Sequence, residues 1–166
     1  PFPSINRNFA IYGNTIIDTS ADDFVYALDT QTGKQVWESR VVDYREDSAQ
    51  ETAGPIIVKG KIISGRGCEY KGTPNGCVIT AHDAKTGKEL WRTRTIPKPG
   101  QPGGDSWGDL PDGQRRHVGA WMVPSYDPTL KRLYLGTSVT SPAPKFMLGG
   151  NAEQHLYHNS TLALDA

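Results

Sequence analysis

The chain lacks several features that would assign it to a membrane, nucleic-acid-binding or disulfide-rich class. No apolar run approaches the ~18 residues of a membrane-spanning helix, so no segment is expected to cross a bilayer. Neither charge is in excess, because 18 Lys and Arg balance 18 Asp and Glu. This balance argues against a nucleic-acid partner, which usually meets a basic face. Two cysteines, Cys68 and Cys77, are too few for a disulfide-scaffolded miniprotein.

Motifs of several enzyme classes are also missing. No G-x-x-x-x-G-K-[ST] or G-x-G-x-x-G segment joins a strand to a helix, so a nucleotide-binding loop is unsupported. No C-x-x-C-H segment offers a haem c attachment within these residues, and no G-x-S-x-G nucleophile elbow occurs. The histidines lack zinc-like spacing with the cysteines. Helical periodicity is absent over any stretch of about 11 residues, which favours β-structure.

A repeated segment is the main feature that the chain does contain. Residues 24–37 read FVYALDTQTGKQVW, and residues 78–91 read VITAHDAKTGKELW in the same register. A third copy opens at residues 160–166, STLALDA. Each complete copy predicts a short strand, a D-x-x-T-G-K turn and a second strand that carries Trp37 or Trp91 inward.

Further strands are expected between the copies, at residues 56–64 and 132–138. The pattern predicts an all-β fold with roughly one four-stranded unit per copy. Such units stack as in a β-propeller, because one unit cannot bury both of its faces, and the repeat tryptophans then dock between neighbouring sheets. A closed ring needs at least about four blades. About three blades fit in residues 1–166, so we expect an incomplete ring that is truncated at both ends.

The A-L-D-x-x-T-G-K-x-x-W repeat resembles the tryptophan-docking motif of quinoprotein dehydrogenases. Members of that family are eight-bladed propellers that hold pyrroloquinoline quinone (PQQ) and a metal, usually Ca²⁺, on the ring axis. The resemblance implies that residues 1–166 are one partial PQQ-binding β-propeller domain. Non-catalytic propellers share the repeat, so the choice between enzyme and scaffold depends on residues outside it.

Three residues outside the repeat match positions that bind PQQ in the alcohol-oxidising branch of the family. Arg7, in Asn6-Arg7, resembles the Arg that contacts a carboxylate and the quinone oxygens, and a planar guanidinium suits that role. Thr52 resembles the Thr that hydrogen-bonds a PQQ carboxylate. Trp121, in HVGAWMVPSYD, resembles the Trp that forms the floor beneath the PQQ ring. A surface Arg, a strand-edge Thr and a core Trp are the alternative interpretations.

The segment S-G-R-G-C-E carries the residues that the resemblance places nearest the metal. Glu69 matches the family's calcium-ligating Glu, and Ca²⁺ prefers such hard oxygen ligands. Gly67 and Cys68 are then expected close to the cofactor plane. The family's second ligand is an Asn in a G-x-G-N-P segment, whereas residues 136–144 read GTSVTSPAP. The hydroxyl of Thr140 or of Ser141 is left as a weaker oxygen ligand there, so the ligand set and the metal stay open.

The cysteine pattern also departs from that branch. Methanol-type enzymes carry an adjacent Cys-Cys disulfide just before the N-R pair, and this chain has none there. Cys68 and Cys77 instead bracket the loop E-Y-K-G-T-P-N-G, which contains enough Gly and Pro to fold back and let the two sulfurs meet. We hypothesise a Cys68–Cys77 disulfide, with two buried thiols as the alternative. The disulfide implies an oxidising compartment, the periplasm.

The resemblance implies an alcohol dehydrogenase. Ca²⁺ bound to Glu69 and PQQ polarises the quinone carbonyl, an Asp base beyond residue 166 removes the alcohol proton, and hydride passes to PQQ. Residues 1–166 alone are therefore expected to be inactive. Small-molecule or polymeric alcohols are the implied substrates, with the polyvinyl-alcohol-type branch the nearest in overall similarity, and cytochrome c or a similar protein is the implied electron acceptor. The alternatives are a non-catalytic propeller scaffold of the bacterial envelope and a PQQ enzyme that acts on an aldose.

Overall fold

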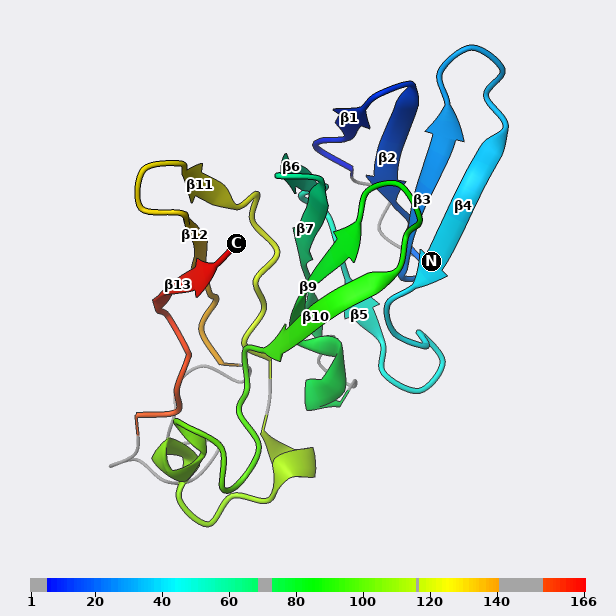
Figure 1. The fold of residues 1–166 in the computed structure, drawn as a ribbon. Coiled ribbons are helices and arrows are strands. Elements are labelled where there is room, and N and C mark those ends of the chain that lie inside the picture. The colour runs from blue at the N-terminus through cyan, green and yellow to red at the C-terminus, as the bar shows by residue number, and fades with distance from the viewer. Residues whose placement is uncertain (1–5, 69–72, 116, 141–153) are drawn as a thin grey trace.

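The protein is described by a computed structural model that covers residues 6–68, 73–115, 117–140 and 154–166 (Figure 1). Strands and loops make up most of these residues. The helical turns among them are short 3₁₀ segments: η1 (Pro74–Gly76), η2 (Gly104–Trp107) and η3 (Asp112–Gln114). None of the helices in this described part is long and apolar enough to span a bilayer.

The strands form three sheets and a separate ribbon, and all of the pairings are antiparallel. The first sheet contains, in hydrogen-bonded order, β1 (Ala10–Tyr12), β2 (Thr15–Thr19), β3 (Phe24–Asp29) and β4 (Gln35–Arg40). The second has the order β10–β9–β7–β6 and contains β6 (Ile56–Val58), β7 (Lys61–Gly65), β9 (Val78–Asp83) and β10 (Glu89–Arg94). The third contains β11 (Ser125–Asp127), β12 (Arg132–Gly136) and β13 (Thr161–Asp165). The ribbon pairs β5 (Ala49–Gln50) with β8 (Gly67–Cys68).

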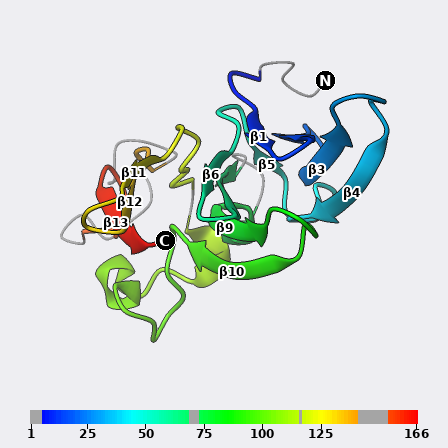
Figure 2. The same ribbon diagram turned by 45° about the horizontal axis from the view of Figure 1, so that its top comes forward.

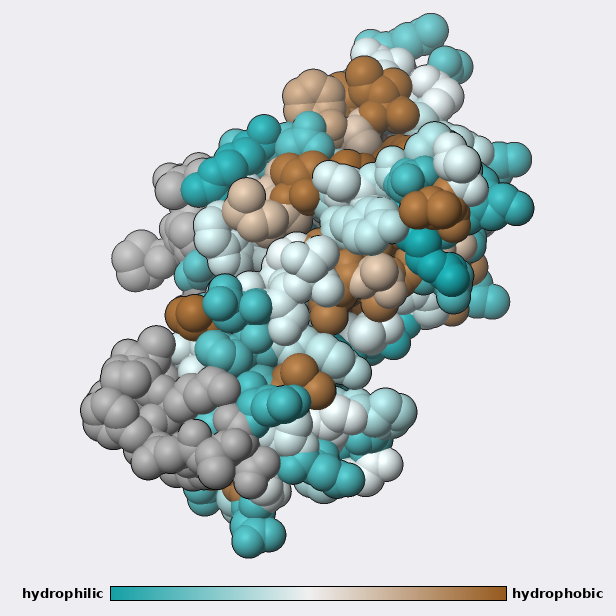
Figure 3. Space-filling view, turned by 90° about the vertical axis from the view of Figure 1, so that its left-hand side faces the viewer, coloured by the Kyte–Doolittle hydropathy of each residue, from teal (hydrophilic) through white to brown (hydrophobic). Residues whose placement is uncertain are grey.

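The three sheets lie side by side in chain order, with the second sheet in the middle (Figures 1 and 2). The expected four-stranded unit is therefore confirmed for the first two sheets, and the described part of the third contributes three strands. On the side of the third sheet, apolar side chains are interspersed with polar ones (Figure 3). The arrangement is that of about three consecutive blades of an open, all-β propeller.

The two repeat turns share one local geometry. The Asp29 carboxylate accepts hydrogen bonds from the backbone N–H and the hydroxyl of Thr32, at 2.8 and 2.7 Å. Asp83 accepts the same pair of bonds from Thr86, each at 2.9 Å. A left-handed glycine, Gly33 or Gly87, directly follows the threonine in each turn and permits the tight reversal. The D-x-x-T-G motif therefore specifies its turn through local hydrogen bonds.

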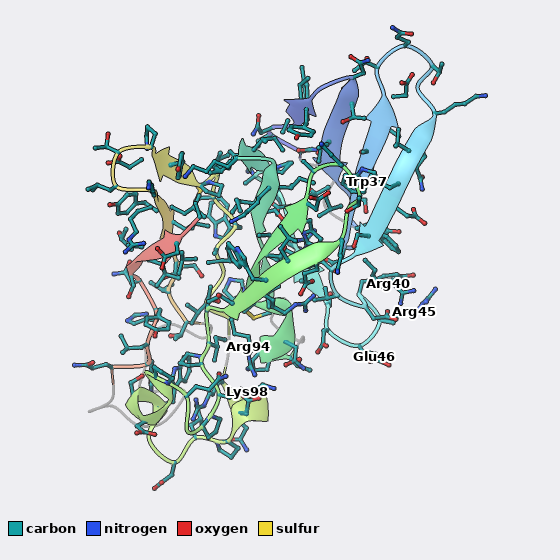
Figure 4. The ribbon with its side chains drawn as sticks, viewed as in Figure 1. Trp37, Arg40, Arg45, Glu46, Arg94 and Lys98 are labelled. Atoms are coloured by element: carbon teal, nitrogen blue, oxygen red, sulfur yellow. A yellow bond between two sulfur atoms is a disulfide. The ribbon has the colours of Figure 1, made fainter. Side chains whose placement is uncertain are left out.

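The repeat tryptophans connect neighbouring sheets, as predicted. Trp37 on β4 lies against Gly87 in the turn of the second sheet (Figure 4), where a Cβ would come within 2.4 Å of the ring. Trp91 on β10 packs against the core cluster that includes Leu133 and Leu135 of the third sheet. Each tryptophan thus covers apolar surface on the next blade, which one sheet could not bury alone.

The middle sheet is buried on both faces. Ile62 and Val78 belong to the core shared with the first sheet, whereas their neighbours Ile63 and Ile79 belong to the core shared with the third. Successive strand residues point to opposite faces, so an uninterrupted apolar run serves both cores. This sandwiched sheet supplies the rigid support for the segments that emerge at its end.

A long connection after β10 is held by Trp107. The ring is buried and stacks on His155, with centroids 4.7 Å apart. Its indole N–H donates to the Leu156 carbonyl, and the Arg115 guanidinium lies 5.7 Å from the ring centroid. Trp107 therefore ties the 95–115 segment to the segment that leads into β13.

Candidate functional site

Arg7, Thr52 and Trp121 come together, although they are far apart in the sequence. The Arg7 guanidinium carbon lies 5.8 Å from the centroid of the Trp121 ring. Its Nη1 donates to the Thr52 carbonyl at 3.1 Å. The Trp121 side chain is 39% exposed, so one large aromatic surface and one fixed cation face the solvent together. Trp121 is therefore not a buried core residue in the structure.

The Thr52 side chain is available for a ligand. Arg7 uses the backbone carbonyl of Thr52, and the Thr52 hydroxyl makes no hydrogen bond to another described residue. The residue is half-buried, beside the cation. A free hydroxyl next to a guanidinium is a suitable pair for a carboxylate ligand.

Glycines let two backbone segments approach each other beneath this surface. A Cβ on Gly119 would lie 2.7 Å from the Gly67 Cα, which is too close for any side chain. A Cβ on Gly67 would meet the Gly119 Cα at 3.4 Å, the His117 ring at 3.6 Å and the Trp121 ring at 3.9 Å. β8 therefore lies directly against the Trp121 segment, and Gly67 presents only backbone beside the aromatic ring.

The predicted Cys68–Cys77 disulfide is confirmed, and both cysteines are buried. The N–H of Cys68 also donates to the Cys77 sulfur at 3.1 Å. On the opposite side, Nδ1 of His117 contacts the Cys68 carbonyl oxygen. Because a carbonyl oxygen only accepts hydrogen bonds, this contact assigns the imidazole proton to Nδ1. The disulfide and His117 thus hold β8 from two directions.

The predicted metal ligands are placed only in part. Glu69 lies outside the described residues. Thr140 is buried, and its segment runs beside the Trp121 segment, because Ser138 and Gly119 exchange two hydrogen bonds of 2.8 and 2.9 Å. Within the described residues, no three His, Cys, Asp or Glu side chains cluster as a metal site would require. Arg7, Thr52 and Trp121, which are predicted to bind PQQ, are brought together, and both the PQQ contacts and the calcium site stay predictions.

A buried charge cluster behind β5 and β8 was missed by the sequence analysis. Arg66 is fully buried, and its Nε donates to the Asp23 carboxylate at 3.1 Å. Glu51 is also buried, and its charge interacts with both of them. Burial raises the pKa of Glu51 to about 7 and that of Asp23 to about 6, while the Arg66 charge opposes both shifts. The only local signal was that Glu51 and Arg66 directly precede two predicted site residues.

Several known proteins resemble this chain in sequence and in fold. A family model described as "PQQ: Glucose/ethanol/alcohol dehydrogenase, beta-propeller domain" matches residues 39–166. The quinohemoprotein alcohol dehydrogenase ADH IIB of Pseudomonas putida is 31% identical over 97% of this chain and 24% of its own length. That of Comamonas testosteroni is 32% identical over 97% and 24%, respectively.

A solved structure shows the same fold. The quinohemoprotein alcohol dehydrogenase ADHIIG of Pseudomonas putida superposes with a TM-score of 0.87 and 30% sequence identity, covering 99% of this chain and 25% of that chain. The chain therefore spans about a quarter of the length of these relatives. The prediction of an incomplete β-propeller of this type is confirmed.

Proposed function

Because the chain belongs to the PQQ family of glucose/ethanol/alcohol dehydrogenase β-propeller domains, we propose that the protein containing it oxidises alcohols with PQQ as its cofactor. The observation that carries this proposal is the convergence of Arg7, Thr52 and Trp121 around the Gly67 backbone. A non-catalytic scaffold has no need to hold a cation over an exposed tryptophan at this place.

The residues present fit a planar quinone that carries carboxylates. The Trp121 ring offers a flat exposed surface for offset stacking. Arg7 and the Thr52 hydroxyl supply a cation and a hydrogen-bond donor for a carboxylate or quinone oxygen. The absence of a side chain at Gly67 lets a ring lie close to the backbone of β8. Cys68 follows in the same strand, with its sulfur directed into the buried disulfide.

We also propose Ca²⁺ as the metal, held by Glu69 with Thr140 as a second oxygen donor. Carboxylate and hydroxyl oxygens are hard ligands of the kind that Ca²⁺ prefers. The support is the sequence position of Glu69 directly after β8, and the course of the Thr140 segment beside Trp121. Metal analysis of the purified protein tests this directly. A different bound metal would change the identity of the proposed ion but not the proposed ligands.

The chain's own residues position the cofactor rather than perform the bond changes. PQQ supplies, when bound with a metal, a polarised quinone that can accept a hydride from an alcohol. Arg7 holds fixed positive charge at one edge of the site, and Trp121 covers one face and excludes water from it. The proton acceptor that the family resemblance implies is an Asp outside residues 1–166, so we propose that these residues alone do not turn over substrate.

The partners and the compartment are also proposals. The relatives are named quinohemoproteins, which supports a haem-containing electron acceptor such as cytochrome c. The Cys68–Cys77 disulfide supports an oxidising compartment, the periplasm.

Dye-linked oxidation of primary and secondary alcohols by the full-length protein, with and without PQQ and Ca²⁺, tests the function. We expect activity that requires both additions and that disappears in Glu69→Ala. An aldose as the preferred substrate would keep the cofactor and change the substrate class. No activity, together with no quenching of tryptophan fluorescence by PQQ, would replace the proposal with the scaffold alternative.

A further inference from the structure

The ribbon of β5 and β8 has one face toward the site and one face toward the interior. Its register pairs Ala49 with Cys68 and Gln50 with Gly67. Alternation along a strand places residues of odd and even position on opposite faces. Gly67 faces the Trp121 ring, and its chain neighbours Arg66, which lies between β7 and β8, and Cys68 are both buried. The buried charges therefore lie on the reverse side of the cofactor-facing backbone.

Glu51 stabilises the turn to which Arg7 is hydrogen-bonded. One oxygen of its carboxylate accepts the backbone N–H groups of Ala53 and Gly54, at 3.2 and 3.1 Å. Thr52 lies within this turn, and its carbonyl accepts the hydrogen bond from Arg7. Charge-assisted bonds to a buried carboxylate are among the stronger hydrogen bonds in proteins. The position of the Thr52 carbonyl, and hence of the Arg7 cation, depends on Glu51.

The same turn packs against the segment that carries Arg7. Gly54 has a φ of +80°, and a Cβ there would lie 1.8 Å from the Asn8 carbonyl oxygen. The Asn8 side chain donates to the Pro55 carbonyl at 3.0 Å. A shift of the turn would therefore move both Thr52, the hydrogen-bond partner of Arg7, and Asn8, its chain neighbour.

Arg66 connects the other half of the site. Its guanidinium donates to Asp23 and, at 3.2 Å, to the Ser64 hydroxyl. Its backbone carbonyl accepts the N–H of Ala120 at 3.2 Å, directly before Trp121, and Gly67 follows it in the chain. Moving Arg66 would therefore move both the strand beneath the cofactor position and the tryptophan segment.

A buried ionic cluster of this kind is not needed for stability alone. Well-packed apolar residues of similar volume are often as stabilising as a buried ion pair, whereas removal of one partner leaves an uncompensated buried charge. The second oxygens of Asp23 and Glu51, and Nη2 of Arg66, have no hydrogen-bond partner within the described structure. Arg66 is the cation that both carboxylates share, and it offsets the repulsion between them, while backbone pairing joins β5 to β8.

We infer that Glu51 and Arg66 are positioning residues for the cofactor, which set the relative placement of Arg7 and Thr52 on one side and of Gly67 and Trp121 on the other. This inference rests on the proposed function. Neither residue is expected to touch PQQ, because both side chains point away from the exposed ring surface into the interior. They act on PQQ affinity through the backbone.

The ionisation of Glu51 gives the inference a second readout. Its pKa of about 7 means that the carboxylate gains its proton as the pH falls from 8 to 6, which weakens its hydrogen bonds to the turn. The charged groups that face it are Arg66 and Asp23. PQQ affinity should therefore decline over this pH range in the wild type. Between pH 8 and 7, above the pKa of about 6 of Asp23, the decline should be absent from Glu51→Gln and should persist in His117→Gln.

The experiment titrates the metal-loaded, PQQ-free full-length protein with PQQ and follows tryptophan fluorescence. We expect Glu51→Gln and Arg66→Lys to weaken binding by about 10- to 100-fold, as supporting residues of this kind do at metal sites. Arg115→Lys is the matched control, because Arg115 is an equally buried arginine beneath Trp107 in another part of the structure. It should lose stability while PQQ affinity stays within about twofold, a change below 0.5 kcal/mol.

The outcomes separate the two claims. If the wild type binds PQQ and the two variants bind with unchanged affinity, the positioning role is wrong and the proposed function stands. If either variant fails to fold, the wild-type pH titration decides, and an affinity that is constant from pH 8 to 6 overturns the role. If the wild type binds no PQQ, the proposed function is wrong, and the positioning role is wrong with it.

Discussion

The repeat turns and the segments between the repeats are built on different principles. The two D-x-x-T-G turns repeat the same hydrogen bonds, within 0.2 Å, because residues three positions apart make them. The connecting segments after β4 and after β10 share no such pattern, and hydrogen bonds between residues 45 or more positions apart hold them in addition to local ones. The repeats therefore supply the frame, and the segments outside them carry the residues of the candidate site. The two kinds of tryptophan belong to these two regions.

The largest difference between the two regions is expected when one tryptophan from each is replaced by alanine. Trp37→Ala should reduce the free energy of unfolding by about 3 kcal/mol or more, because the ring fills the space between two sheets. Trp121→Ala should cost less than about 1 kcal/mol, because its ring is already partly in water. It should instead weaken PQQ binding by about 10- to 100-fold through lost stacking. Denaturant unfolding and PQQ titration of both variants of the full-length protein measure the contrast, and a similar profile for the two would contradict it.

Two equivalent glycines of the repeats should differ in the stability that they lose on substitution by alanine. Gly33 and Gly87 have φ values of +68° and +72°, so alanine at either site should cost about 1 kcal/mol in backbone strain. Nothing lies within 4 Å of a Cβ on Gly33, whereas one on Gly87 meets the Trp37 ring. Gly87→Ala should therefore cost about 1–3 kcal/mol more than Gly33→Ala. Equal losses in denaturant midpoint would mean that Trp37 does not dock at this turn.

Removal of the disulfide tests how the connecting region supports the site. The double variant Cys68→Ser, Cys77→Ser should lose about 2 kcal/mol of stability, at the low end of the usual range because the loop is short. Since β8 carries Gly67, PQQ affinity should fall as well. Unfolding curves and PQQ titrations under non-reducing conditions give both values. Unchanged affinity in the variant would show that the disulfide does not support the site.

The smallest effects are expected in the turns themselves. Hydrogen bonds from Thr32 and Thr86 hold the pKa values of Asp29 and Asp83 below the usual value of 3.8. These carboxylates therefore stabilise the fold above that pH, and the contribution is lost as the pH falls through the folded pKa. Thr32→Val and Thr86→Val should each lower the melting temperature slightly at pH 7, with the difference shrinking toward pH 2. Clearly unequal effects of the two substitutions would contradict the equivalence of the turns.

The repeat region was predictable because its information is local. The positions of β3, β4, β9 and β10 followed from strand-forming runs on either side of an Asp–Thr–Gly turn. The placement of Arg7 near Trp121 was not local, and it came from resemblance to a family whose residues match in register. The disulfide was accessible because its two cysteines bracket a short, flexible loop.

The buried cluster was not predictable from the sequence for a physical reason. Charged residues are normally exposed, so Arg66, Glu51 and Asp23 read as surface positions when taken singly. Their burial depends on a pairing between Arg66 and Asp23 across 43 positions, which no strand or turn pattern reports. Only the fold shows that these charges lie behind the backbone of β8.

The central claim is that Arg7 and Trp121 form a PQQ-binding surface at the inner end of the blades. A crystal structure of the full-length protein with PQQ tests it most directly. The account predicts the quinone ring stacked on Trp121, with Arg7 at one edge and the backbone of Gly67 beside it. PQQ bound elsewhere, or a Trp121 ring covered by another part of the protein with no cofactor against it, would contradict the account.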